Sequence, residues 1–466
     1  MPSADIVLPA SMSRIAVVAP RSRARDALVE LARRGTVELV GNLPPPEGEE
    51  AEALRRLSRR GQEDGEGPAL LSRRPDVAAL EQAGGQRLIE GEVELQRRAR
   101  LAVDHGSFSA WLGWAPSGEI EDLNDGLAAL DAAVVALPAP AWVEPPTLLS
   151  PVAVQERFRP LVRSYGTSPY RDVDPTLFTL VSFVLMFGMM FGDVGHGLML
   201  VLIALVLRRW TGRRFAGTRH LWPIVLAAGL SAVVFGFLYG EAFGPTGLLP
   251  TLWLDPLEEP IKLLVAALGV GAVLLVVSYV LGIVNRWRRG GLREALFAQF
   301  GVAGLLVFVG GLVVIGGVYA SLPAVAVVGG IVAAVGLVLL AFGLVLDAGR
   351  GAAAVTQATV EFVDAVIRLA SNLVSFTRLA AFGLMHAAIG AIVFAGATAL
   401  WGGVAGSIAA AVVFVGGNLL AFALEALVTG VQALRLEYYE LYSRIFTGEG
   451  HPFSPWRMTV LQEEEP

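Results

Sequence analysis

Residues 372–386 read NLVSFTRLAAFGLMH, a stretch apolar enough for a lipid bilayer except for one arginine, Arg378. Arginine keeps its proton at any ordinary pH. A charged side chain at the centre of a membrane helix costs about 3 kcal/mol on insertion scales, and such residues usually have a function. The stretch therefore predicts one of two things: a segment outside the membrane, or a membrane helix whose charge is needed.

The composition favours the membrane. The chain has 466 residues, of which 54% are hydrophobic and only 17% are charged, whereas soluble domains carry about 25% charged residues. Long apolar runs dominate residues 176–447, and residues 1–170 are mixed and charged. The chain has no cysteine, which excludes structural disulfides and thiolate metal sites. These features predict a polytopic membrane protein.

The apolar runs predict the spans. A membrane helix needs about 20 apolar residues, and the fold class expected here is a polytopic α-helical membrane protein with eight transmembrane helices. The last two runs are too long for a perpendicular crossing, so we expect two long, tilted C-terminal helices. The eight predicted segments are 176–192, 194–210, 220–240, 261–286, 298–318, 323–346, 354–400 and 404–446.

Basic residues occur in every second loop between these segments. The basic loops contain RRWTGRRFAGTRH, NRWRRGGLRE and DAGR, and the four intervening loops contain no lysine or arginine. The positive-inside rule places the basic loops in the cytoplasm. An even number of spans then predicts that both termini are cytoplasmic.

The N-terminal region has the pattern of a small α/β domain. An alternating stretch (Ile15–Val18) precedes a helical pattern (Ala24–Leu31) and a second short strand (Val37–Val40). A further helix (88–104), the strand FSAWLGWAP, another helix and the strand VVALP follow. The start of the chain shows no cleaved signal peptide. The predicted organisation is a cytoplasmic α/β domain (1–145) with a Pro-, Gly- and charge-rich low-complexity excursion (41–85), a linker (146–175), a transmembrane domain (176–457) and an acidic cytoplasmic tail (458–466).

The last two predicted spans carry polar residues inside the apolar runs. On a continuous helix, Asp364 and Arg378 lie within about 40° of one face, with Ser375 on the same side. On the eighth segment, Glu425 and Gln432 are seven residues apart and nearly eclipsed. The polar groups form two offset sets around Arg378, as a proton or sodium pathway would need. One set is Glu361 and Asp364, and the other is His386, Glu425 and Gln432.

Structural explanations compete with this reading. Charges near helix ends commonly snorkel or pair, which we expect for Arg368 and Glu437; for Glu361 both explanations stay open. The glycine pairs at 310–311, 316–317 and 329–330 are typical of helix packing. The GDVGHG string has the wrong spacing for a dinucleotide loop and predicts a tight turn between two helices.

Several long motifs resemble one family. The sequence is similar to the membrane subunit of V/A-type rotary ATPases, called subunit a or subunit I, and the form of its last motif indicates a bacterial or archaeal member. The motifs occur in the family's order over residues 144–457: EPPTLL, YRDVDPTLFTLVSFVLMFGMMFGDVGHG, FGFLYGEAFG, NRWRRGGLREALF, NLVSFTRLAAFGL and LEALVTGVQALRLEYYELYSRIFTGEGHPFSPW.

The resemblance implies residue roles. Arg378 matches the essential arginine that faces a rotating ring of c (or K) proteolipid subunits, and Arg435 matches a second family arginine. An opposite charge nearby lowers a carboxylate's pKa, so Arg378 would promote ion release from ring carboxylates. Asp364 occupies the acidic position of the cytoplasmic half-channel, and Glu425 and His386 match the outer half-channel. Gln432 stands where eukaryotic members have histidine.

The resemblance also implies a context. The chain would be a non-catalytic subunit carrying H⁺ or Na⁺ without a cofactor, in a bacterial plasma membrane. Its partners would be the c/K ring, E/G-type peripheral stalk subunits, and the central-stalk base with the A and B catalytic subunits. The N-terminal region is shorter than the family's, which predicts a reduced stalk-binding domain. The alternatives are a stand-alone ion channel or ion-coupled transporter derived from this family, and a membrane scaffold with structural charges.

Overall fold

The computed structural model describes residues 9–59, 67–140, 143–149, 158, 161–162, 165–209, 221–348, 352–446 and 450–461. The chain divides into two compact units. Unit 1 comprises Met1–Ser150 and Gly450–Pro466, and unit 2 comprises Pro151–Glu449. The end of the last family-like motif therefore belongs with the N-terminal region, although the sequence placed it with the membrane domain.

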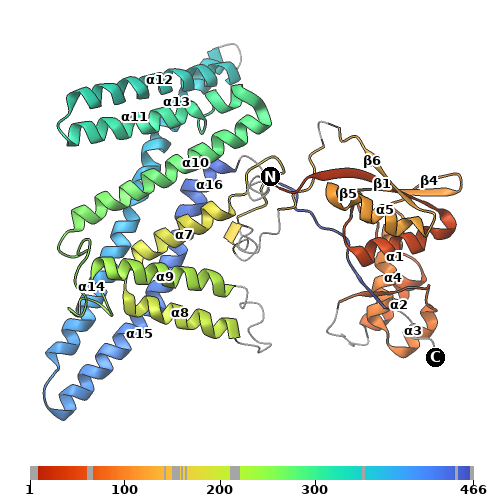
Figure 1. Ribbon diagram of the computed structural model, residues 1–466, viewed down its shortest axis with the longest axis horizontal. Coiled ribbons are helices and arrows are strands. Elements are labelled where there is room, and N and C mark those ends of the chain that lie inside the picture. Colours follow the sequence, from red (N-terminus) through yellow and green to blue (C-terminus); the bar gives the residue numbers. More distant parts are fainter. Residues whose placement is uncertain are drawn as a thin grey trace. The chain divides into compact units, whose positions relative to one another are not determined.

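Unit 1 contains a five-stranded antiparallel sheet (Figure 1). Its central strand β1 alternates as the sequence predicts, and Ile15, Val17 and Ala19 point into the core. The strand order is β2-β5-β1-β6, with β4 paired to β5. The strands are β1 (Met12–Pro20), β2 (Glu38–Leu39), β4 (Val103–His105), β5 (Phe108–Pro116) and β6 (Ala133–Leu137).

Helices pack against this sheet, and some lie where none was expected. The stretch 41–85, expected to be an irregular excursion, contains α2, β3 and α3 in its described residues. Its apolar residues Ala51, Ala53 and Leu57 pack against Ile89 and Val93 of α4 in a small core of their own. The helices of unit 1 are α1 (Ala24–Arg34), α2 (Glu49–Ser58), α3 (Val77–Ala83), α4 (Gln86–Ala99) and α5 (Ile120–Ala128).

The C-terminal residues complete unit 1. Strand β7 (Thr459–Leu461) pairs in parallel with β3 (Ala69–Leu71). Trp456 is buried in the main core, and its backbone N–H donates to the carbonyl of Val37 at 3.0 Å. The described part of the expected acidic tail is therefore a strand.

Unit 2 is helical (Figure 1). Helices α8 and α9 lie side by side, as do α11 and α12, and α14 and α15 form a long hairpin. The helices are α7 (Thr176–Met190), α8 (Val194–Arg209), α9 (Trp222–Tyr239), α10 (Pro260–Phe297), α11 (Val302–Tyr319), α12 (Pro323–Ala348), α13 (Ala352–Val374), α14 (Thr377–Ala399), α15 (Gly403–Leu436) and α16 (Tyr442–Ile445).

Among the residues that the structure describes, six segments are long and apolar enough to cross a membrane: Trp222–Tyr239, Pro260–Phe297, Val302–Tyr319, Pro323–Ala348, Val355–Ala399 and Gly403–Ile445. These correspond to the last six of the eight predicted segments. The first two predicted segments form α7 and α8, which have 15 and 16 residues. At about 1.5 Å per residue each is shorter than a bilayer core of about 30 Å. The chain is an integral membrane protein, but the count of eight spans is not confirmed.

The seventh predicted segment is two helices, α13 and α14, rather than one. The helix breaks at Ser375 and Phe376, two residues before Arg378. Phe376 is fully buried, and its ring packs so closely on α10 that a Cβ at Gly271 would lie 2.3 Å from it. The backbone responds with i−3 bonds, such as Leu379 N–H to Phe376 O at 3.0 Å. The angle expected between Asp364 and Arg378 on one continuous helix therefore does not apply.

The eighth segment changes its winding near its end. α15 is regular to Leu436, a π-helical turn (Glu437–Leu441) follows, and α16 closes the segment. A π turn adds a residue to the helical repeat and is frequent at functional sites. Here the π turn carries Glu437 and Glu440 and sets the direction of their side chains, both of which are buried.

Candidate functional site

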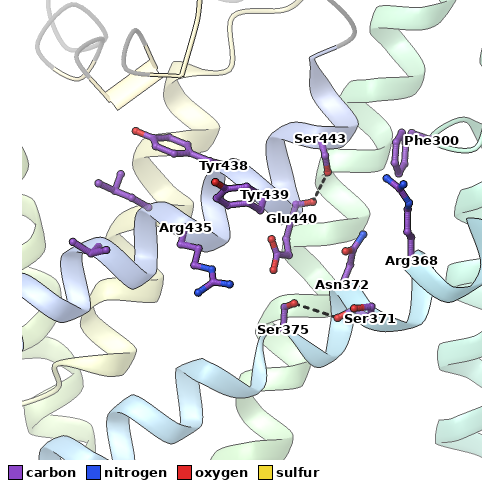
Figure 2. Close-up of a pocket in the computed structure, with 12 residues that line it drawn as sticks. Phe300, Arg368, Ser371, Asn372, Ser375, Arg435, Tyr438, Tyr439, Glu440 and Ser443 are labelled. Carbon is purple, nitrogen blue, oxygen red and sulfur yellow. Dashed lines mark hydrogen bonds between the residues drawn. The ribbon is translucent and has the colours of Figure 1, made fainter. Parts of the chain in front are cut away.

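A pocket of about 870 Å³ opens in unit 2 where α13 faces α15 and the π turn (Figure 2). Most of its lining is polar or aromatic, in contrast with the apolar runs on either side. Of the predicted site residues, Ser375 and Arg435 line this pocket. The lining residues are Phe300, Arg368, Ser371, Asn372, Ser375, Val431, Leu434, Arg435, Tyr438, Tyr439, Glu440 and Ser443.

Arg378 has an acidic partner that the sequence analysis did not identify. Its Nη1 lies 3.8 Å from Oε1 of Glu440. The Glu440 side chain is 7% exposed and that of Arg378 is 27% exposed. Nη1 is buried without a hydrogen bond to any described residue, so the contact is an ion pair rather than a hydrogen bond, and other parts of the Arg378 side chain remain exposed. The EYYE string at 437–440 shows that acidic residues lie near the end of the eighth segment. The direction in which their carboxylates point depends on the π turn.

Arg435 is exposed at the pocket, and no ion pair to it occurs among the residues that the structure describes. In Figure 2 the carboxylate of Glu440 points into the pocket between Arg435 and Arg368. Arginine holds its charge in any surroundings. The pocket therefore presents one fixed positive charge that no described acidic group neutralises.

The acidic residues of α13 are not brought to Arg378. Glu361, Asp364 and Arg368 are exposed on α13. Asp364 pairs with Arg368 at 2.7 Å, and Glu361 accepts a hydrogen bond from Gln357 at 2.9 Å. Ser375 donates to the carbonyl of Ser371 at 3.2 Å.

Gln432 and Glu437 are both more enclosed than their positions suggested. Oε1 of Gln432 is buried without a hydrogen-bond partner among the described residues. Glu437, expected to snorkel or to pair with a cation near the helix end, is fully buried and accepts a hydrogen bond from Ser182 Oγ at 2.6 Å. The π turn directs it inward, against α7.

A second polar group lies on the other part of the α14–α15 hairpin. Nδ1 of His386 contacts Oε2 of Glu425 directly, and both residues are buried. The structure thus joins two of the predicted site residues from different helices. Two further buried residues, Asp193 and His196, extend this group: ligand atoms of Asp193, His196 and His386 all lie within 4.8 Å of one another. We call Asp193, His196, His386 and Glu425 the histidine cluster.

Asp193 holds its surroundings together. Its Oδ1 accepts the backbone N–H of His196 at 2.9 Å, and its Oδ2 accepts that of Gly244 at 2.8 Å. Gly244 has φ +89°, and a Cβ there would lie 2.8 Å from the backbone of Gly390. GDVGHG is a tight turn, as predicted, but its aspartate and histidine also reach His386. That contact joins residues almost 200 positions apart, so no local pattern predicts it.

Glu241, in the loop after α9, is a further buried acid near this cluster. Its side chain is only 4% exposed, and burial raises its pKa to about 8. The backbone carbonyl of Glu241 accepts the N–H of Val194 at 3.0 Å, which ties the loop to the start of α8.

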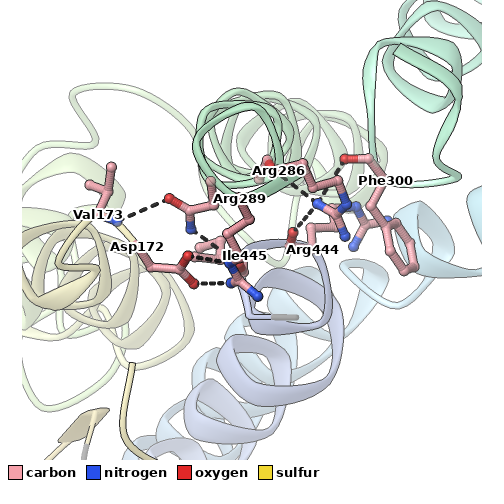
Figure 3. Close-up of polar contacts among 9 residues, drawn as sticks. Asp172, Val173, Arg286, Arg289, Phe300, Arg444 and Ile445 are labelled. Carbon is pink, nitrogen blue, oxygen red and sulfur yellow. Dashed lines mark hydrogen bonds and ion pairs between the residues drawn. The ribbon is translucent and has the colours of Figure 1, made fainter. Parts of the chain in front are cut away.

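A network of three arginines, two of them buried, fixes the end of the eighth segment against α10 (Figure 3). Arg444 is fully buried and lies 4.9 Å from the ring centre of Tyr279. Its carbonyl accepts a hydrogen bond from Arg286 at 2.9 Å. Arg289 makes a two-pronged ion pair with the buried Asp172. The π turn that carries Glu440 is therefore anchored at its C-terminal side.

These features define an integral membrane protein with charged and titratable side chains gathered at two places in its helical unit. Residues 103–262 match the V-type ATPase 116kDa subunit family. The A-type ATP synthase subunit I of Pyrococcus horikoshii is 27% identical over 359 residues, which cover 74% of this chain and 53% of the relative. The V-type ATP synthase subunit I 2 of Treponema pallidum is 37% identical over 153 residues, which cover 30% of this chain and 33% of the relative.

A third relative gives the same result: the A-type ATP synthase subunit I of Archaeoglobus fulgidus is 26% identical over 407 residues, which cover 77% of this chain and 59% of the relative. The chain is therefore similar to the V-type ATPase 116kDa subunit family over residues 103–262 and to ATP synthase subunit I over about three quarters of its length. It spans about half the length of the curated relatives that it matches.

Proposed function

We propose that this chain is the stator membrane subunit of a V/A-type rotary ATPase and carries H⁺ or Na⁺ to and from the carboxylates of a proteolipid ring. The observation that carries the proposal is Arg378, whose Nη1 has a single acidic neighbour at 3.8 Å and no hydrogen bond among the described residues. A ring carboxylate that approached this guanidinium would be stabilised in its ionised form. It would then release its ion.

Two offset polar groups support two half-channels. His386 lies eight residues beyond Arg378 on α14, which is about 12 Å along the helix. On α15, Glu425 and Arg435 are ten residues apart, about 15 Å. The pocket at Arg435 would give access on one side of Arg378, and the histidine cluster on the other. The role first expected for Asp364 and Glu361 would require access along the exposed face of α13.

The remaining parts of the proposal concern the complex. The positive-inside pattern places the basic loops and both termini in the cytoplasm, and unit 1 would then meet peripheral stalk subunits there. ATP chemistry would reside on A and B subunits joined through the central stalk, with this chain non-catalytic. The cargo would be H⁺ or Na⁺, and no cofactor is needed for a carboxylate–arginine exchange.

The test is ATP-driven ion pumping by the whole complex in sealed vesicles. We expect Arg378→Ala to reduce pumping to background while the complex still assembles. Arg293→Ala is the matched control, because Arg293 is an exposed arginine of α10 paired with Asp347 at 2.9 Å, outside the pocket. Wild-type pumping by the Arg378 variant would refute the proposal. Gradient-driven ion flux through the purified chain alone would instead favour a stand-alone channel.

A further inference from the structure

We propose that the histidine cluster is a binding site for a divalent transition metal, with Zn²⁺ as the best match. Asp193, His196 and His386 each offer a ligand atom, and these atoms lie within 4.8 Å of one another. All three side chains are buried. They come from the turn before α8, from α8 itself and from α14, so the packing of the helices assembles the site.

His196 is the residue that most needs a ligand. It is 1% exposed, and neither ring nitrogen makes a hydrogen bond of good geometry to a described residue, although the backbone of Asn418 lies near the ring. Its ring sits among the rings of Phe191, Phe243 and Phe422, with centroids 5.5 to 5.9 Å away. A buried polar group without a partner costs free energy. A metal ion in the cluster would satisfy one nitrogen.

His386 is oriented as a metal-ligating histidine usually is. Its Nδ1 contacts the carboxylate of Glu425, which leaves Nε2 as the ligand atom. A carboxylate on the far nitrogen fixes the ring's tautomer and orientation and raises the basicity of the ligating nitrogen. Its ring centroid is 5.4 Å from that of His196, so the two imidazoles can share one ion.

Asp193 supplies the third ligand. Its oxygens already accept two backbone N–H groups, but a carboxylate has about four lone-pair sites. Oδ1 of Asp193 and Nδ1 of His196 are 3.9 Å apart. Ligands of a tetrahedral zinc ion lie about 3.3 Å apart, so the three ligand atoms, which now lie within 4.8 Å of one another, would move closer together around a bound ion.

The donor set selects the metal. Two imidazoles and one carboxylate suit Zn²⁺, whereas Ca²⁺ and Mg²⁺ prefer oxygen ligands alone. Three protein ligands leave a fourth position open to water. The chain has no cysteine, so no thiolate elsewhere in it competes for the ion.

A bound ion would have a consequence that rests on the proposed function. It would bind His386, whose Nδ1 contacts Glu425. We place both of these residues in one half-channel. Zn²⁺ would then inhibit ion pumping by the complex, and chelation would relieve the inhibition. Binding to the purified chain is independent of that consequence, so it is tested separately.

The experiment is metal binding by the full chain, purified without a polyhistidine tag in detergent. We expect Co²⁺ to give visible d–d absorption that saturates at about one equivalent and is removed by Zn²⁺. His196→Gln should weaken binding at least about 10-fold, and Glu425→Gln about 10- to 100-fold, as a lost outer carboxylate does. His105→Gln is the matched control, because His105 is exposed on β4, and it should bind as the wild type does.

X-ray absorption at the zinc edge tests the wild type without any variant, so a variant that misfolds does not decide the matter. We expect two imidazole ligands. No saturable binding by the wild type, fewer than two imidazoles, or unchanged binding by folded His196→Gln would each overturn the site. Metal binding without inhibition of a pumping complex would keep the site and contradict only its place in the ion path.

Discussion

The most informative single contact is the ion pair between Arg378 and Glu440, in which Nη1 and Oε1 lie 3.8 Å apart. Glu440 comes from a π turn and is almost entirely enclosed, whereas Arg378 keeps about a quarter of its surface exposed. Such a pair holds the guanidinium in place without saturating it.

A double-mutant cycle measures how strongly the two residues are coupled. We expect Glu440→Gln to lower the stability of the purified chain by about 1–3 kcal/mol, because a partly enclosed guanidinium loses its counter-charge. Arg378→Gln combined with Glu440→Gln should cost less than the sum of the two single changes. Thermal unfolding in detergent gives the values. Strictly additive changes would show that the ion pair contributes nothing.

The glycine pairs show how closely α11 packs against α12. In each pair of the α11–α12 hairpin, one glycine faces the other helix and its neighbour faces open space. A Cβ at Gly310 would lie 2.5 Å from the backbone nitrogen of Ala333, whereas a Cβ at Gly311 would meet nothing within 4 Å. The glycine pairs in the sequence predicted helix packing. The structure shows which glycine of each pair faces the other helix.

The pair Gly310→Ala and Gly311→Ala tests that assignment with the same chemical change one residue apart. We expect Gly310→Ala to cost about 1–3 kcal/mol, because the backbones of α11 and α12 must separate. Gly311→Ala should be neutral or stabilising by up to about 1 kcal/mol, because alanine favours the helix. Tryptophan fluorescence during thermal unfolding is the measurement. Equal effects would contradict the assignment.

At the scale of the whole molecule, unit 1 is built from both ends of the chain. The indole of Trp456 is 4.9 Å from the guanidinium of Arg98, and Met458 N–H donates to the carbonyl of Ala32 at 2.9 Å. Segments more than 300 residues apart in sequence thus share one core. Unit 2 is the continuous chain between them.

Trp456→Ala tests that organisation. We expect a loss of about 3–5 kcal/mol, typical of a large aromatic removed from a core, and faster hydrogen exchange in β1 and α1. Trp401→Ala is the control, because Trp401 is 73% exposed after α14. Unchanged exchange in unit 1 of the Trp456 variant would mean that the C-terminal residues do not stabilise it.

The orientation in the membrane is also a property of the whole molecule. The chain has no cysteine, so single cysteines can report it. Leu322→Cys, in the loop between α11 and α12, should react with an impermeant maleimide on intact cells; Leu292→Cys, near the end of α10, should react only after the membrane is opened. Both side chains are exposed, at 52% and 65%. The reverse labelling would invert the proposed topology.

Much of the architecture follows from local patterns. The last six predicted spans are helical, because a backbone in lipid must satisfy its hydrogen bonds within the segment. The seventh is divided into two helices, and α10 extends to Phe297, beyond its predicted end at residue 286. The strand expected at Ile15–Val18 lies within β1, where alternate residues face the core. These patterns depend on residues that are close together in the sequence, so they can be recognised without the tertiary structure.

The sites depend on other information. The break at Phe376 arises from its fit against Gly271 of α10, and Glu440 meets Arg378 because a π turn re-aims it. The histidine cluster joins residues 193 and 196 to 386 and 425 through helix packing. Local sequence patterns are enough to predict which segments are helical and which charges they carry. Which charges meet depends on helix packing, because the rotation and spacing of each helix are set by side chains on its neighbours.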